Sequence, residues 1–314
     1  MNIDCDMRTA IVDGRMKVFI DLKYNPNHGP DGRFTSGGGR GGSGSTDPTD
    51  ARGGGPFNEY HDDKKYPPAN SNGVDTQQRF KKPDGTYTKE RQALHDNIEK
   101  EYFEGKSPAE GQAEFLLMGG GSASGKSSVF RHGLVKTPDN MVKMDSDDIK
   151  GKLPEYDAMV KGKNSKAAAY AHEESSDISK QIMGKGLKQN YNTMLDGTGD
   201  SSLEKLKKKT DAARAAGHRV RAVYLTVDTN EAIRRSDARA EKSGRKVPHE
   251  AIRAIHSSVS RVVPQAIKAG LYDDFELWDN NAVGKPPKRI ARAKGTKLEV
   301  LDEKAWAAFL AKGE

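Results

Sequence analysis

The sequence predicts an α/β fold in which a mostly parallel β-sheet is flanked by helices, preceded by a disordered N-terminal extension. Two observations predict the sheet: from residue 113 onward short apolar runs alternate with helix-forming stretches, and the first run ends in a glycine-rich loop. A third predicts the extension. Residues 25–56 are dominated by Gly, Ser, Asp and Pro, which bury too little apolar surface to offset their ordering entropy.

The composition limits the class of protein. The chain has 314 residues, 34% of them apolar, and a formal net charge of +7. Its single cysteine, Cys5, excludes an internal disulfide and fits a reducing cytosol. No apolar run approaches the roughly 18 residues of a membrane span, and the N-terminus lacks a signal-peptide core. We therefore expect a cytoplasmic protein without a membrane partner.

We expect four regions along the chain. Residues 1–24 form a short N-terminal segment, in which Met16–Leu22 is either a strand or a docking segment. Residues 25–83 are a flexible linker, because they are rich in Gly, Ser and Pro. Residues 84–290 form one α/β domain, and residues 291–314 form a C-terminal strand and helix extension.

The elements of the domain follow from local pattern. Helix formers fill Thr88–Phe103, and Ser107–Glu110 has the spacing of a capping box with Pro at the first helical position. The predicted strands are Phe115–Met118, Met141–Met144, Asn192–Leu195, Val220–Val227 and Phe275–Trp278. The predicted helices are Ser165–Lys188, Ser202–Ala216, Asn230–Lys242 and Pro248–Ala269. On the last of these helices, apolar residues recur at helical spacing and predict core: Ile252, Ile255, Val259, Val262 and Ile267.

The stretch GGSASGKSS after the first strand matches the G-x-x-x-x-G-K-[S/T] pattern of a phosphate-binding loop. A strand before the loop and a helix start at Ser127–His132 give the context that this motif requires, and the alternative is a flexible glycine linker. Backbone N–H groups would face a nucleotide's phosphates, with Lys126 on the β- and γ-phosphates and Ser127 on Mg²⁺. The nucleotide-binding residues would be Gly120, Gly121, Ser122, Ala123, Ser124, Gly125, Lys126, Ser127 and Ser128.

Acidic residues follow the next two strands, at the edge where ligands of a parallel sheet gather. Asp145, Asp147 and Asp148 follow the second strand, and Asp196 and Thr198 follow the third. An acid at a helix start can also be a cap. We expect capping for Asp148 and a catalytic, metal-binding or substrate-binding role for Asp145 and Asp147.

Basic residues near a helix break could close over a nucleotide. Arg239 and Arg245 flank Ser243-Gly244, a break between two predicted helices, so a short lid could bring both guanidinium groups onto the phosphates. A solvated helix face is the alternative, and we expect it for Arg234 and Arg235. Glu174, on the helix before the third strand, is either surface or a contact to substrate.

Other chemistries find little support in the sequence. The eight histidines and one cysteine form no zinc-binding spacing, and His249 and His256 are too far apart for H-E-x-x-H. No G-x-S-x-G elbow is present.

Four stretches together resemble the zeta toxin family of P-loop kinases. They are YTKERQALHDNIEKEYFEGKSPAEGQAEFLLMGGGSASGKSS from Tyr87, MDSDDIKGKLPEYD from Met144, MLDGTGD from Met194 and DARAEKSGRKVP from Asp237. The order and spacing of several motifs agree, which is more specific than the loop alone.

The resemblance implies a P-loop kinase fold and an ATP-dependent kinase with Mg²⁺, since members phosphorylate UDP-N-acetylglucosamine. It implies that Lys126 and Ser127 bind ATP and Mg²⁺ and that Asp147 is the base. Arg239 and Arg245 would be lid arginines. Asp196 and Thr198 would line the sugar-nucleotide pocket, and Asp145 and Glu174 are further candidate substrate contacts. An antitoxin is a candidate partner.

Two further observations concern substrate and origin. Asp200 stands where toxin members can carry a basic residue, and a carboxylate beside a diphosphate repels it. Separately, KYNPNHGPDGRFTSG (Lys23–Gly37) is similar to a segment of phage head and portal-associated proteins. This similarity implies a phage or prophage origin, with a capsid or portal contact through the N-terminal segment.

Three functions follow as hypotheses. The first is a zeta-type kinase of a sugar nucleotide in the cytoplasm of a bacterial host. The second is a nucleoside or polynucleotide kinase with the same loop and base, which the net charge of +7 favours and which keeps nucleic acid as an alternative partner. The third is a virion-associated protein in which the kinase fold is a passenger.

Overall fold

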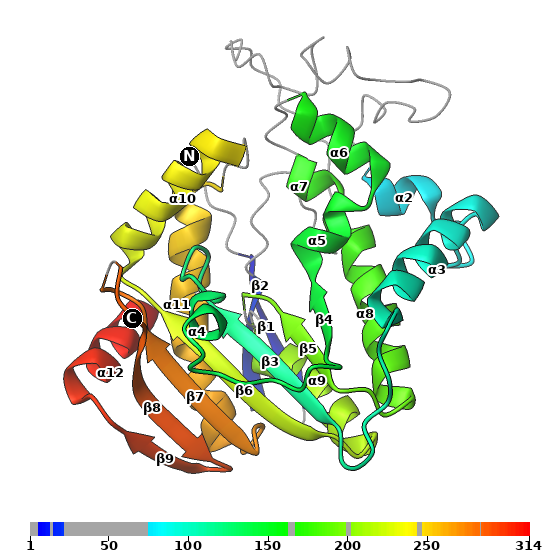
Figure 1. Ribbon diagram of the computed structural model, residues 1–314. Helices are drawn as coiled ribbons and strands as arrows, with labels where there is room; N and C mark the ends of the chain where they lie inside the picture. Colours follow the sequence, from blue (N-terminus) through cyan, green and yellow to red (C-terminus); the bar gives the residue numbers. More distant parts are fainter. Residues whose placement is uncertain are drawn as a thin grey trace, which may run out of the picture.

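The computed structural model of the protein describes residues 6–12, 15–21, 75–162, 167–198, 202–243, 247–282 and 284–314 (Figure 1). The predicted linker up to residue 74, the phage-like segment Lys23–Gly37 and the residues Asp200 and Arg245 lie outside this description.

A seven-stranded sheet in the order β4-β5-β3-β6-β7-β8-β9 forms the centre of the domain (Figure 1). The strands are β3 (Glu114–Gly120), β4 (Val142–Asp145), β5 (Thr193–Asp196), β6 (Arg219–Thr226), β7 (Asp274–Asp279), β8 (Lys288–Lys294) and β9 (Lys297–Val300). The first five are the predicted strands and all run parallel. Strands β8 and β9 join antiparallel at one edge, so the predicted mostly parallel sheet is confirmed.

The strand order explains where a site can form. Strand β3 lies between β5 and β6, and β4 pairs with β5. After β3 the chain therefore forms β4 and β5 on one side of β3, and then β6 and β7 on the other side. At such a switch point a parallel sheet has a crevice at the carboxyl ends of its strands. The loop after β3 and the acidic residues after β4 and β5 all meet at this edge.

Helices cover both faces of the sheet. They are α2 (Thr76–Phe80), α3 (Lys89–Phe103), α4 (Ser128–Arg131), α5 (Ser146–Gly151), α6 (Pro154–Lys161), α7 (Ala167–Tyr170), α8 (His172–Lys188), α9 (Leu203–Ala215), α10 (Thr229–Ser243), α11 (His249–Lys268) and α12 (Glu303–Leu310), followed by the 3₁₀ turn η1 (Ala311–Gly313). In Figure 1, α10 and α11 lie on the left and α5–α8 with α2 and α3 lie on the right.

Alternation along β3 divides the core between the two faces. Phe115 and Leu117 join a core with α9, α11 and α12, whereas Leu116 and Met118 pack with α4. A further core joins β4 to α3, α5 and α8. The predicted apolar positions of α11 are confirmed, because Ile252, Val259, Val262 and Ile267 are buried and Ile255 is partly buried.

Some local predictions were wrong. Residues Ser107–Glu110 form no helix. Ala109 N donates to Asn190 O over 2.8 Å, which ties this short segment to the end of α8 just before β3 begins. The structure places ordered elements inside residues 75–83 of the predicted linker: Thr76–Phe80 form α2, capped by the buried Asp75, and Lys81 pairs with Tyr87 in an isolated bridge. The predicted helix Ser165–Lys188 divides into α7 and α8.

The C-terminal part belongs to the domain. Strand β8 crosses the expected boundary at residue 290 and pairs with β7, and Trp306 and Phe309 of α12 join the main core. Near the N-terminus, β1 (Asp6–Val12) and β2 (Arg15–Asp21) form a separate antiparallel hairpin, which confirms a strand in the apolar patch from Met16. In the described part of the chain, no helix is long and apolar enough to span a bilayer.

Candidate active site

Two backbone hydrogen bonds shape the loop between β3 and α4. Ser124 N donates to Gly121 O over 3.1 Å, and Ser128 N donates to Gly125 O over 2.9 Å. Gly125 has a φ of +79°, a conformation that favours glycine, and a Cβ there would lie 2.4 Å from Asn280 Nδ2. Strand, loop and helix start therefore adopt the arrangement that the phosphate-binding motif requires.

Two hydroxyl groups of this loop fit an anionic ligand. Ser124 Oγ and Ser128 Oγ are buried, and neither has a hydrogen-bond partner among the described residues. Buried polar atoms are normally hydrogen-bonded, so an unpaired hydroxyl calls for a missing partner. Phosphate oxygens accept hydrogen bonds strongly, and the free end of α4 adds backbone donors. The loop residues thus fit the phosphates of a nucleotide.

Strand pairing brings the predicted acidic residues next to the loop. Asp145 and Asp196 occupy paired positions at the carboxyl ends of β4 and β5, and Asp196 also pairs with Met118 of β3. Lys126 Nζ lies 3.6 Å from Asp196 Oδ1. The loop lysine and the acid of the third predicted strand therefore face one another.

The surroundings of Asp196 disfavour the ionised form of its carboxyl group. Burial raises its pKa to about 6, Lys126 opposes that rise, and the negative charges of Asp145 and Asp147 add to it. Asp145, Asp147 and Asp196 thus lie close together, with Lys126 beside Asp196. A carboxyl group whose pKa is raised by burial and by neighbouring negative charges is a feature of functional sites.

Helix α5 carries the predicted base. Asp145 is its N-cap, since Asp145 Oδ1 accepts from Asp147 N over 2.8 Å. The expectation that Asp148 caps this helix was therefore wrong: Asp148 Oδ2 instead accepts from Tyr102 Oη over 2.6 Å. Asp147 Oδ1 lies 3.2 Å from Nζ of the buried Lys150, which fixes the side of the helix on which the carboxylate lies.

The segment after β5 lies against the loop. Gly120 N donates to the backbone O of Thr198 over 3.2 Å, and Gly197 N donates to Met118 O over 3.0 Å. Thr198 itself is exposed. The acid-Gly-Thr stretch is thus attached by its backbone to the phosphate-binding loop.

Helix α10 carries three arginines that the sequence analysis considered: Arg234, Arg235 and Arg239. The predicted break between the two helices is present, because Val247 and Pro248 lie outside any helix and α11 begins at His249. Arg239 is partly buried on α10, and Arg234 is exposed as expected. Arg235 was wrongly expected at the surface: its Nη2 donates to Asn280 O over 2.8 Å, and its Nε donates to Glu231.

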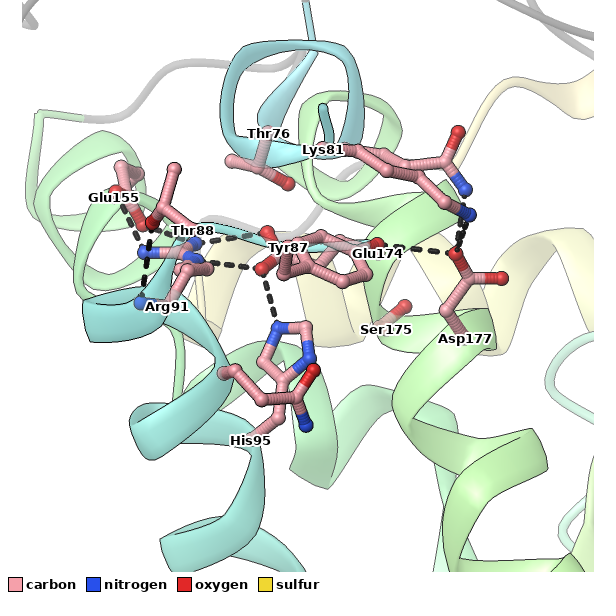
Figure 2. A network of polar contacts seen from close by, with 12 residues as sticks. Thr76, Lys81, Tyr87, Thr88, Arg91, His95, Glu155, Glu174, Ser175 and Asp177 are labelled. Atoms are coloured by element: carbon pink, nitrogen blue, oxygen red, sulfur yellow. Dashed lines mark hydrogen bonds and ion pairs between the residues drawn. The ribbon is translucent and has the colours of Figure 1, made fainter. Parts of the chain in front are cut away.

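Glu174 lies apart from these residues, in a buried network shown in Figure 2. Arg91 of α3 reaches Glu174 through Nε at 2.5 Å and Nη2 at 2.8 Å, and it binds both oxygens of Glu155 on α6. His95 Nε2 is 2.6 Å from Glu174 Oε1. These partners lower the pKa of Glu174 to about 2 despite its burial. A substrate contact from Glu174 stays a prediction.

Sequence reasoning missed three residues of the site. His256 Nε2 lies 2.9 Å from Ser122 O, Asn280 Nδ2 lies 2.8 Å from Ser124 O, and Lys150 contacts Asp147. One signal was available for His256, because it sits on the apolar face of α11 between Ile252 and Val259. Nothing in the local pattern marks Asn280.

The fold and the loop together define a protein of the P-loop kinase fold. Within that class the chain belongs to the zeta toxin family, whose family model matches residues 99–281.

Two curated relatives are similar in sequence. "Toxin zeta" of Streptococcus pyogenes is 25% identical over 197 residues, and "Toxin zeta" of Enterococcus hirae is 24% identical over 201 residues. Each alignment covers 60% of this chain and 68% of the relative.

Solved structures share the fold at low identity. A structure from the PezAT chromosomal toxin-antitoxin system of Streptococcus pneumoniae has a TM-score of 0.52 at 17% identity, covering 62% of this chain and 79% of that one. The AvrRxo1-ORF1:AvrRxo1-ORF2 structure with ATP has a TM-score of 0.56 at 15% identity, covering 77% and 83%. These likenesses establish the fold only.

Proposed function

We propose that this protein is an ATP-dependent phosphotransferase of zeta type, which transfers the γ-phosphoryl group of Mg-ATP to a hydroxyl of UDP-N-acetylglucosamine or a related sugar nucleotide. The observation that carries the proposal is the position of Lys126. This cation belongs to a phosphate-binding loop and also faces Asp196 at the end of the neighbouring strand, 3.6 Å away. Nucleotide site and acceptor site therefore meet at one lysine.

The nucleotide side uses the loop. Backbone N–H groups of the loop bind the phosphates, Lys126 binds the β- and γ-phosphates, and Ser127 is the metal ligand. Bound Mg²⁺ supplies charge neutralisation across the phosphates. No cluster of three or more His, Cys, Asp or Glu able to hold a metal occurs in the described ranges, which fits an ion that takes most of its ligands from phosphate and water.

Asp147 is the proposed base. It accepts the proton of the acceptor hydroxyl while that oxygen bonds to the γ-phosphorus and the bond to the ADP oxygen breaks. Lys150 Nζ, 3.2 Å from Asp147 Oδ1, orients the carboxylate. Arg239 and Arg245 are the proposed lid arginines on the transferring group.

The acceptor side is formed by Asp196, Thr198 and Asp145. We propose that Asp196 binds sugar hydroxyls and that Thr198 lies near the diphosphate, since Thr198 is attached to the loop through Gly120. Glu174 contacts substrate in this proposal only if its bonds to Arg91 and His95 open. Asp200 disfavours a diphosphate next to it unless a cation intervenes.

A panel assay tests the proposal. The purified full-length chain is incubated with Mg-ATP and sugar nucleotides, nucleosides or 5′-hydroxyl oligonucleotides, and products are followed by ³¹P NMR. We expect a new phosphomonoester on the sugar nucleotide, absent in Asp147→Asn. Transfer to nucleosides or oligonucleotides alone would move the protein to the second function, and no transfer to any acceptor would leave the fold without kinase activity.

A nucleoside or polynucleotide kinase is the second candidate, favoured by the net charge of +7. We also propose an antitoxin as partner, because one structural neighbour comes from a toxin-antitoxin system. A phage capsid or portal contact through the N-terminal segment, with virion association, remains our proposal from the sequence of Lys23–Gly37. A deletion of residues 1–56 separates docking from catalysis, since we expect it to remove the association with the virion and to keep kinase activity.

A further inference from the structure

We infer that His256 and Asn280 are positioning residues, which hold two carbonyl groups of the phosphate-binding loop so that the following N–H groups face the nucleotide. The inference rests on the proposed nucleotide site. It assigns a role to side chains from α11 and from the end of β7, far from the motif in sequence.

His256 supports the first half of the loop. Its Nε2 lies 2.9 Å from the carbonyl oxygen of Ser122, and the residue is 3% exposed. The imidazole also fills the space beside Gly121, where a Cβ would lie 2.3 Å from the ring atom Cδ2. Glycine at position 121 is thus required by the histidine and not by its own φ.

Asn280 supports the second half in the same way. Its Nδ2 donates to Ser124 O over 2.8 Å, and the residue is 8% exposed. Its own backbone is fixed twice, because Asn280 N donates to Thr226 O over 2.9 Å and Arg235 Nη2 donates to Asn280 O over 2.8 Å. The amide therefore reaches the loop from a rigid base at the sheet edge.

The consequence follows from the geometry of the peptide unit. In a planar trans peptide the C=O and the next N–H point in opposite directions, and the described chain has no cis bond. Holding Ser122 O on His256 therefore directs Ala123 N–H to the opposite side. Holding Ser124 O on Asn280 does the same for Gly125 N–H. His256 and Asn280, on one side of the loop, thus orient the N–H groups of Ala123 and Gly125 toward the other side.

The histidine is suited to this task because it is neutral. Burial is the main cause that lowers the pKa of His256, and the charges of Lys312 and Lys126 act in the same direction. The hydrogen bond to Ser122 O and the charge of Asp228 oppose them, and the resulting pKa is about 4. A neutral imidazole has one N–H, and the carbonyl of Ser122 takes it.

Nucleotide binding tests the inference. Dissociation constants for Mg-ADP are measured by calorimetry on the full chain, with thermal stability recorded in parallel. His256→Met fills similar volume without a donor and should weaken binding about tenfold, the size expected of one lost hydrogen bond. His256→Gln keeps a donor and should restore most of the affinity. Asn280→Leu should also weaken binding.

A matched control separates positioning from stability. His218 is 2% exposed, and its Nε2 lies 3.0 Å from Tyr191 O. Both residues lie at the amino ends of the strands, away from the phosphate-binding loop. His218→Met should lower thermal stability as much as His256→Met does and leave Mg-ADP affinity unchanged. Equal affinity in His256→Met and His218→Met would overturn the inference.

A double-mutant cycle gives a second readout. Gly121→Ala should weaken Mg-ADP binding strongly in the presence of His256, because the new Cβ meets the imidazole, and should have a smaller effect in the background of His256→Ala. Additive effects would contradict the inference. If the wild-type chain does not bind Mg-ADP, both the proposed function and the inference are overturned. If the wild-type chain binds Mg-ADP and Lys126→Ala does not, the nucleotide site is supported whatever the variants of His256 and Asn280 show.

Discussion

Glu174 and Asp196 were both expected to contact substrate, and the structure places them in opposite electrostatic surroundings. Glu174 is fully buried, yet Arg91 and His95 bind it and its pKa is lowered to about 2. Asp196 keeps 25% of its side chain exposed and has Lys126 at 3.6 Å, yet burial, together with the smaller effect of the charges of Asp145 and Asp147, raises its pKa to about 6.

The difference distinguishes a carboxylate that organises the fold from one that is available to a ligand. The charge of Glu174 is satisfied by α3, so it ties α3 to α8 and needs nothing further. The charge of Asp196 is opposed by its neighbours, so a bound cation or a hydroxyl donor would improve its surroundings. Burial alone does not separate the two cases, whereas the count of donors around each carboxylate does.

The largest effect is expected at the neighbour that repels Asp196. Asp147→Asn removes the proposed base and should slow phosphoryl transfer by about 10²–10⁴-fold, while Mg-ATP affinity stays within about twofold because the loop is untouched. Single-turnover transfer and calorimetry check the two parts. If Asp145→Asn is the damaging change and Asp147→Asn is mild, the base is Asp145.

The next effect concerns the Glu174 side and is one of stability. Arg91→Met removes the guanidinium that binds both Glu155 and Glu174 and leaves Glu174 with His95, which should lower the free energy of unfolding by about 3–5 kcal/mol. Urea denaturation measures it. Lys208→Met is the control, because the side chains of Lys208 and its partner Glu204 are 74% and 54% exposed and that pair should be worth about 1 kcal/mol or less. Equal losses in the two variants would show that the buried network is no stronger than a surface pair.

Replacing Asp196 should separate activity from stability. Asp196→Asn should lower kcat/KM for the acceptor by about 10–100-fold through a lost charged hydrogen bond and leave the fold as stable as before or more stable. Acceptor titrations at saturating Mg-ATP, together with urea denaturation at pH 7.5, check this. Destabilisation as large as that of Arg91→Met would place Asp196 with the structural carboxylates.

The two carboxylates should also give opposite pH dependence. The folded-state pKa of Asp196 is raised from 3.8 to about 6, so its ionised form costs up to about 3 kcal/mol above pH 6. The excess stability of Asp196→Asn should therefore shrink as pH falls from 6 to 4.

The pKa of Glu174 is lowered from 4.5 to about 2, so its contribution to stability is complete above pH 4.5 and is lost as pH falls toward 2. The deficit of Glu174→Gln should accordingly narrow only below pH 4.5. Urea denaturation from pH 3 to pH 8 measures both gaps.

Much of the fold could be predicted because its signals are local. The five parallel strands are short apolar runs, and the loop motif carries its own turn residues. The helix at Ser107–Glu110 failed for the opposite reason: its cap signal is local, whereas the hydrogen bond from Ala109 N to Asn190 O ties this segment to the end of α8. At the site, strand order gave the positions of Asp145 and Asp196 but not their electrostatics.

The sequence by itself determined the P-loop, the mostly parallel sheet and the set of acidic residues at its carboxyl edge, since each depends on residues adjacent in the chain. Only the tertiary structure decided which carboxylate is neutralised and what holds the loop. Glu174 meets Arg91 across 83 positions, and the anchors of the loop carbonyls, His256 and Asn280, lie 134 and 156 positions from their partners. The physical reason is that burial and charge pairing depend on distances in space, which a run of neighbouring residues does not fix.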